Sequence, residues 1–216
     1  MVYEHRYKEK IEKTITDADF ARVLERARKY REERKVKHSY DPRFKDINVA
    51  GLIAILYYTG LRVSEVVGDP VHGYLTKSGF KMSKVVKGIL KGNIELRGDF
   101  IRIQANEVRK HGKRDSPLWI KRDKLGVQDI IEVWKATGIG ERVFPISRTY
   151  AWRFVKDVTG NLYPHFFRLN RATKFAEHPQ TSVKDLKDWF GWVDARTIEK
   201  YMAKGGRATK EMASRM

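Results

Sequence analysis

A short stretch of strand-like sequence interrupts a chain that is otherwise patterned for helices. Between residues 93 and 120, the runs Ile94–Leu96 and Phe100–Ile103 flank the turn Arg97-Gly98-Asp99, and a third run ends at Ile120. Alternating apolar and polar residues around a glycine-containing turn are typical of a β-hairpin. We therefore expect one small antiparallel sheet of three strands, with helices packed around it.

Helical periodicity accounts for most of the remaining sequence. A capping-box pattern at Thr16 and Asp19 precedes apolar residues at helical spacing, which predicts a helix from Asp17 to about Arg34. A buried helix should end near Gly60, and a short helix should follow it. Further helices are expected at about residues 127–137, 147–158, 165–177, 182–191 and 194–204. The predicted fold class is mainly α with a small three-stranded antiparallel β-sheet (α+β).

The domain organisation predicted from this pattern is simple. Residues 1–13 are expected to form a linker or frayed segment, residues 14–204 one domain, and residues 205–216 a C-terminal tail. Within the domain, residues 71–92 form a lysine-rich insertion with five lysines and no acidic residue.

Helical spacing within the insertion favours a surface helix. Its expected apolar face consists of Met82, Val85, Val86 and Ile89, and its basic face of Lys84, Lys87 and Lys91. Gly88 weakens this helix prediction. The basic face is either laid against phosphates or solvated, and both interpretations stay open.

The composition points to an anionic partner. The 216-residue chain carries 45 Lys and Arg against 27 Asp and Glu, a net charge of +18, and nucleic acid is the first candidate for such a surplus. No apolar run approaches the roughly 18–20 residues that span a bilayer. With no cysteine, the chain has neither disulfides nor thiolate metal ligands.

Five residues have the chemistry for cutting a phosphodiester bond: Arg62, Lys110, His165, Arg168 and Tyr201. Arginines hold the non-bridging oxygens, while lysine and imidazole move protons and a tyrosine hydroxyl attacks. Arg62 lies in the segment TGLRVSE, at the junction of two expected helices, where Glu65 could orient it. We find no acidic cluster resembling a two-metal site and predict neither a metal nor another cofactor.

The order and spacing of these residues are specific. His165 and Arg168 form an H-x-x-R pair, Trp192 follows Arg168 by 24 residues, and Tyr201 follows Trp192 by nine. Together with the TGLRVSE segment, this pattern resembles the catalytic domain of the tyrosine recombinase/integrase family, and is similar to archaeal virus or plasmid integrases. One departure is that Leu169-Asn170 stands where the family often has a second histidine.

The resemblance implies a role for each residue. Arg62 and Arg168 would stabilise the transition state, and Tyr201 would attack to form a 3′-phosphotyrosyl link. Lys110 would protonate the leaving oxygen, with Lys113 as the rival general acid, and His165 would assist proton transfer. Trp192 would hydrogen-bond the phosphate or pack the tyrosine helix. The expected DNA-backbone contacts are Lys84, Lys87, Lys91, Lys113 and Arg114.

The resemblance also implies partners and a setting. The expected partner is double-stranded DNA, and no membrane is involved. The protein would form a homotetramer on paired DNA sites and would be a monomer without DNA. Its expected location is cytoplasmic and DNA-associated. Residues 205–216 would be exchanged between subunits or would fray. Family members usually carry an N-terminal helical domain, and only about fifteen residues precede the expected catalytic domain here. Two alternatives stay open, a type IB topoisomerase-like relaxing enzyme and a non-catalytic basic DNA-binding domain.

Overall fold

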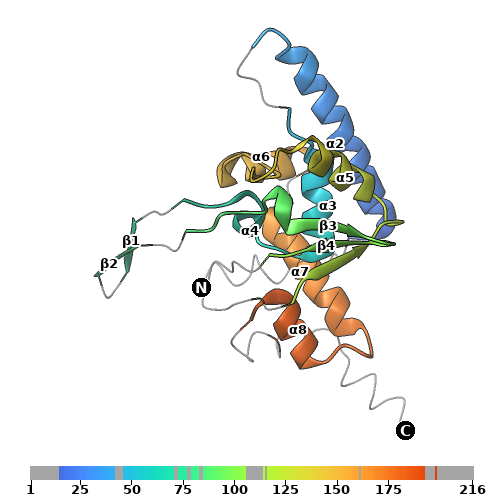
Figure 1. Cartoon of the computed structure of the whole chain (residues 1–216), viewed down its shortest axis with the longest axis vertical. Coiled ribbons are helices and arrows are strands. Elements are labelled where there is room, and N and C mark those ends of the chain that lie inside the picture. The colour runs from blue at the N-terminus through green and yellow to red at the C-terminus, as the bar shows by residue number, and fades with distance from the viewer. Residues whose placement is uncertain are drawn as a thin grey trace.

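The computed structural model describes residues 15–41, 46–70, 73–76, 79–82, 85–105, 114, 116–160, 162–192 and 198. The fold is mainly helical with one three-stranded antiparallel sheet, so the predicted fold class is confirmed (Figure 1). The helices are α2 (Asp17–Lys37), α3 (Val49–Thr59), α4 (Val63–Val67), α5 (Val127–Ala136), α6 (Arg148–Thr159), α7 (Pro164–Glu177) and α8 (Val183–Phe190). The strands are β1 (Gly73–Thr76), β2 (Gly79–Met82), β3 (Ile94–Arg97), β4 (Phe100–Ile103) and β5 (Leu118–Lys121).

Helix α3 forms the centre of the core. All eleven of its residues are buried, as expected for a helix that is apolar on every side, and it packs against α2, α5 and α7. The helix begins where the side chain of Asn48 accepts a hydrogen bond from Gly51 N at 2.9 Å. A Cβ atom on Gly51 would lie 2.8 Å from the backbone oxygen of Asp129, so α5 can cross this closely only at a glycine.

The predicted sheet is present in the order β3-β4-β5. Ile101 lies opposite Ile120 and Ile103 lies opposite Leu118, and all four side chains are buried. The intervening residues face outward, and Trp119 is 42% exposed. The alternation that predicted this sheet therefore also determines which face of it covers the core.

The helix predicted for the lysine-rich insertion is wrong. Strands β1 and β2 pair as an antiparallel hairpin that projects from the body of the molecule (Figure 1). The chain then returns in extended conformation, and Val86 exchanges two backbone hydrogen bonds with Asp69, at 2.8 and 3.0 Å. Val85 is 49% exposed whereas Val86 is 3% exposed, which is the alternation of a strand. The two ends of the insertion meet at the end of α4, and this pairing overrides the local helical spacing.

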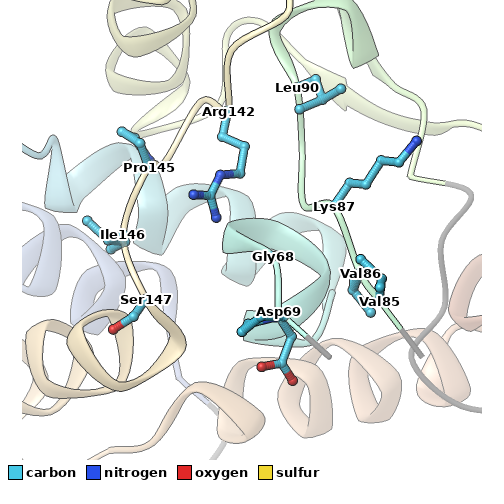
Figure 2. Close-up of a pocket in the computed structure, with 11 residues that line it drawn as sticks. Gly68, Asp69, Val85, Val86, Lys87, Leu90, Arg142, Pro145, Ile146 and Ser147 are labelled. Atoms are coloured by element: carbon cyan, nitrogen blue, oxygen red, sulfur yellow. The ribbon is translucent and has the colours of Figure 1, made fainter. Parts of the chain in front are cut away.

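The returning segment borders a cavity of about 560 Å³. Figure 2 shows the guanidinium of Arg142 directed towards Gly68, and the ammonium of Lys87 directed away from the loop that carries Arg142. Arg142 Nη1 donates to Val67 O at 3.0 Å, and Arg148 on α6 lies 3.2 Å from the carboxylate of Asp69. These contacts anchor the base of the insertion to the core.

Gly88 lets the returning chain pass close to the backbone at the end of α4. Its replacement by alanine is expected to destabilise the protein. Its φ is +81°, and a Cβ there would lie 2.6 Å from Gly68 N and 2.8 Å from Val67 C. Backbone strain and a clash against backbone together should lower the free energy of unfolding by about 2–4 kcal/mol. Chemical denaturation would measure this loss.

Gly140 provides the matched control for that substitution. It has a similar φ of +79° but no atom within 4 Å of a built Cβ. Gly140→Ala should therefore show the strain alone, about 1 kcal/mol. Equal losses in the two variants would contradict a tight crossing at Gly88.

Candidate functional site

The junction between α3 and α4 holds Arg62 in a defined position. Helix α3 ends at Gly60, which has a left-handed φ of 62°, and Arg62 occupies the N-cap of α4. Arg62 donates to Glu65 twice, from its backbone N to Oε2 at 3.0 Å and from Nη1 to Oε1 at 2.8 Å. Its side chain is 21% exposed, so Glu65 orients an arginine that is only partly buried.

The carboxylate of Glu65 is the hub of a cluster of three arginines. Its side chain has no exposed surface, and Arg114 Nη2 and Arg168 Nη1 lie 3.8 and 3.9 Å from Oε2. Burial opposes ionisation, but the charges of Arg168, Arg114 and Arg62 prevail and lower the pKa of Glu65 below its ordinary value. Glu65 is therefore ionised at neutral pH and holds guanidiniums from three parts of the chain.

Arg168 joins the ends of α3 and α8. It extends from α7 and is 1% exposed, with Nη1 donating to Gly60 O and Nη2 to Phe190 O, both at 2.9 Å. Its guanidinium centre lies 5.0 Å from the Phe190 ring and 5.4 Å from the Trp192 ring. A phosphate could reach this buried group only after the end of α8 has moved.

His165 lies in the first turn of α7, directly after Pro164. It is exposed, whereas Arg168 three residues later is buried. The H-x-x-R spacing thus brings the two residues to neighbouring positions on α7, one directed to solvent and one to the interior. An exposed imidazole at a helix N-terminus is well placed to meet an anion.

The position of Arg114 shows that the DNA contact predicted for it from the sequence is wrong. We expected it to contact DNA as part of a basic turn, but its side chain is completely buried. Its Nε donates to Trp189 O at 2.8 Å and its Nη1 to Ala105 O at 2.6 Å, so it ties the end of β4 to α8. Burial lowers the pKa of the Arg114 guanidinium. No sequence signal distinguished this arginine from its basic neighbours, because its acceptor on α8, Trp189 O, lies 75 residues further along the chain.

Trp192 belongs to a small apolar cluster beside Arg168. It is 8% exposed and stacks on Phe190 at 4.6 Å between ring centroids. Ile198, three residues before Tyr201, is 1% exposed in the same cluster. Tyr201 itself lies outside the described residues, as do Lys84, Lys110 and Lys113.

Lys87 and Lys91, the other two lysines that were predicted to contact DNA, lie in different surroundings. Lys87 is exposed, and Figure 2 shows its ammonium directed away from Arg142. Lys91 donates to Thr137 O and lies 5.5 Å from the ring of Trp134. Lys91 therefore helps to hold the chain that follows α5.

The described part of the chain offers neither a metal site nor a membrane span. Among its His, Cys, Asp and Glu side chains, no group of three is placed to hold a metal ion. No helix in the same ranges has the length and apolar character needed to cross a membrane.

Comparison with known proteins yields a likeness of fold. No family model and no curated protein matches the sequence. Among solved structures, the chain is similar to the crystal structure of XerA recombinase, with a TM-score of 0.55 and 13% sequence identity. The match covers 94% of this chain and 62% of that chain, so this chain spans less than two thirds of its structural neighbour.

Proposed function

We propose that this protein is a site-specific DNA recombinase of the integrase type. It would cleave and rejoin DNA strands through a 3′-phosphotyrosyl intermediate on Tyr201. The observation that carries the proposal is the cluster around Glu65, which brings Arg62 from the α3–α4 junction to Arg168 from α7. The cluster lies in a fold that is similar to that of XerA recombinase.

The proposed reaction transfers a phosphoryl group of the DNA from the 5′-oxygen to the oxygen of Tyr201. The Tyr201 oxygen attacks the scissile phosphorus and passes its proton to His165. The P–O5′ bond breaks, and the leaving 5′-oxygen takes a proton from Lys110 or Lys113. Arg62 holds the non-bridging oxygens, because Glu65 orients its guanidinium and the side chain is only partly buried. His165 assists proton transfer. The reverse reaction reseals the strand, since the phosphotyrosyl bond conserves the energy of the broken one.

Arg168 takes part only after a rearrangement in this scheme. Its two carbonyl acceptors and the rings of Phe190 and Trp192 enclose it in the structure. Movement of residues 190–192 would expose its guanidinium to a bound phosphate. The segment that carries Tyr201 follows directly, so docking of the tyrosine and release of Arg168 would occur together.

The proposal is tested by trapping the covalent intermediate. End-labelled duplex with a nick near the scissile phosphate, and supercoiled plasmid as a site-tolerant substrate, would be incubated with the protein and separated on denaturing gels. A protein–DNA adduct is expected without added metal. The absence of both adduct and plasmid relaxation would favour the non-catalytic DNA-binding alternative.

The same assay separates the recombinase from the topoisomerase alternative. A recombinase joins strands from two sites and is expected to act as a tetramer on paired double-stranded DNA, whereas a type IB topoisomerase relaxes supercoils as a monomer. Recombinant products on paired sites would support our proposal. Relaxation of plasmid by a monomer, with no recombinant on any paired sites, would favour the topoisomerase. A cytoplasmic, DNA-associated location follows from either interpretation.

The lysine-rich insertion is proposed to bind DNA backbone. Replacing Lys84 and Lys87 by alanine is expected to reduce the slope of log K against log salt by about 0.9 for each phosphate that the protein no longer neutralises. Lys29→Ala on α2, where the side chain is 78% exposed, is the matched control and should leave the slope unchanged. Lys91→Ala is measured separately because of its hydrogen bond to Thr137 O. If the double variant has the same slope of log K against log salt as the wild-type protein, the lysines of the insertion form a solvated surface and do not contact DNA.

A further inference from the structure

Arg171 carries a charge for which the described chain offers no acceptor. Its guanidinium centre lies 4.2 Å from the ring of Phe175 and 5.5 Å from the ring of Trp189. Its Nε is buried without a hydrogen-bond partner, and no carboxylate of the described residues forms an ion pair with it. The side chain of Arg171 is half-buried. Partial burial of a cation without a counter-charge is unfavourable, and such groups are normally paired. Arg114 and Arg168, which are more deeply buried than Arg171, both face Glu65.

Arg171 lines a cavity of about 490 Å³ between α7 and α8. Lys174 and His178 line the same cavity, and their spacing of three and four residues places all three basic side chains along one face of α7. Trp189 closes the cavity from α8. Arg171 and Lys174 also line a second cavity of about 260 Å³ towards α2 and α3.

The other charged groups near this cavity are already engaged. The ammonium of Lys174 donates to Tyr57 Oη at 2.9 Å and lies 3.8 Å from Asp17. The carboxylate of Asp185 accepts from both Ser182 N and Ser182 Oγ, at 2.8 and 2.7 Å, as the cap of α8. Arg171 is thus the group in the cavity wall whose charge has no protein acceptor among the described residues.

We propose that the cavity between α7 and α8 binds a phosphate group through Arg171, with the Lys174 ammonium and the His178 imidazole as further hydrogen-bond donors. The guanidinium centre lies near both aromatic rings, and Arg171 lines the cavity, where an oxyanion would meet guanidinium and ammonium groups, which bind oxyanions strongly. The phosphate belongs either to a DNA backbone or to free phosphate. The site is separate from the proposed reaction, because none of the residues proposed for catalysis lines the cavity.

The first test is thermal unfolding of the full chain in inorganic phosphate and in chloride at matched ionic strength. The unfolding midpoint should rise by about 3–6 °C when phosphate exceeds its Kd roughly tenfold. Arg171→Gln should abolish this rise. Arg153→Gln removes the same charge from an exposed position on α6 and should leave the rise intact. No rise in the wild-type protein, or an equal rise in Arg171→Gln, would overturn the proposal.

Stability in chloride distinguishes a binding residue from a structural one. If Arg171 is kept for a ligand, Arg171→Gln should unfold at no lower temperature than the wild-type protein, because it removes an unpaired buried charge. A large drop in the unfolding midpoint would instead identify a packing role and count against the site. Calorimetric titration with inorganic phosphate should give one site per chain in the wild-type protein.

The source of the phosphate is determined from duplex binding at several salt concentrations. A slope reduced by about 0.9 in Arg171→Gln assigns the phosphate to DNA, and an unchanged slope with lost phosphate binding assigns it to free phosphate. Repeating both measurements with Tyr201→Phe in the background separates this site from the proposed function. The phosphate effect should persist there even if no strand cleavage is ever detected.

Discussion

Replacing Tyr201 by phenylalanine is expected to abolish the covalent protein–DNA adduct. The substitution removes one oxygen, the proposed attacking atom, and leaves the ring to pack as before. Because no other group takes over the bond to phosphorus, adduct formation should fall by at least about 10³-fold. The measurement is the fraction of end-labelled DNA retained by protein on a denaturing gel. Binding of intact duplex should stay within a factor of about two, since a neutral hydroxyl contributes little to phosphate affinity.

Tyr150→Phe is the matched control for the tyrosine prediction. Tyr150 lies on α6 and is 56% exposed, so the same atom is removed from a surface position. Adduct formation should be unaffected. If Tyr201→Phe still forms the adduct, another nucleophile is at work and the proposed role of Tyr201 is wrong. If adduct formation is lost in both variants, the defect lies in the preparation and not in the chemistry.

The sheet and the helix boundaries could be predicted because their signals are local. The turn at Gly98 and the alternation on both sides of it determine strand pairing within ten residues. The insertion could not be predicted in the same way. Val85 and Ile89 fit a helical spacing as well as an extended one, and the choice depends on how Gly88 passes Gly68. This contact brings together two segments about twenty residues apart, and no local sequence pattern indicates that they pair.

In the candidate site too, the contacts between residues close in sequence could be predicted, and those that depend on distant parts of the chain could not. The sequence placed Glu65 beside Arg62, because three residues separate them at a helix start, and the structure has this contact. The spacing of His165 and Arg168 could not tell which of them faces the interior, since that depends on where α3 and α8 end. The burial of Arg114 could not be predicted from the sequence, because it depends on partners far away in the chain, the carbonyl group of Trp189 and the carboxylate of Glu65.

Replacing Glu65 by glutamine is expected to destabilise the protein strongly. The substitution keeps the shape of the side chain but removes the negative charge shared by Arg62, Arg114 and Arg168. Two of these guanidiniums are almost wholly buried, so their charges would lose their counter-ion without gaining water. Loss of one partner from a buried charge cluster lowers the free energy of unfolding by about 3–5 kcal/mol. For a chain of this size, the unfolding midpoint should fall by about 6–20 °C.

Glu95→Gln is the matched control for this prediction. Glu95 also pairs with two arginines, Arg97 at 2.6 Å and Arg102 at 2.9 Å, but its side chain is 37% exposed. Solvent screens that pair, so the control should change the unfolding midpoint little or not at all. Equal effects in the two variants would mean that the charge of Glu65 does not hold the cluster together.

The pH dependence gives an independent check on Glu65. Because the pKa of Glu65 is lowered in the folded protein, its charge contributes stability above the pKa of the unfolded chain, and this contribution is lost as the pH falls through the folded value. The difference in stability between the wild-type protein and Glu65→Gln should therefore be constant from pH 7 to about pH 5, and should narrow below about pH 4. A difference that persists unchanged into acid would show that the amide disturbs packing, and that charge is not the cause. A difference that narrows identifies the ionised carboxylate as the group that keeps Arg62 oriented for a phosphate.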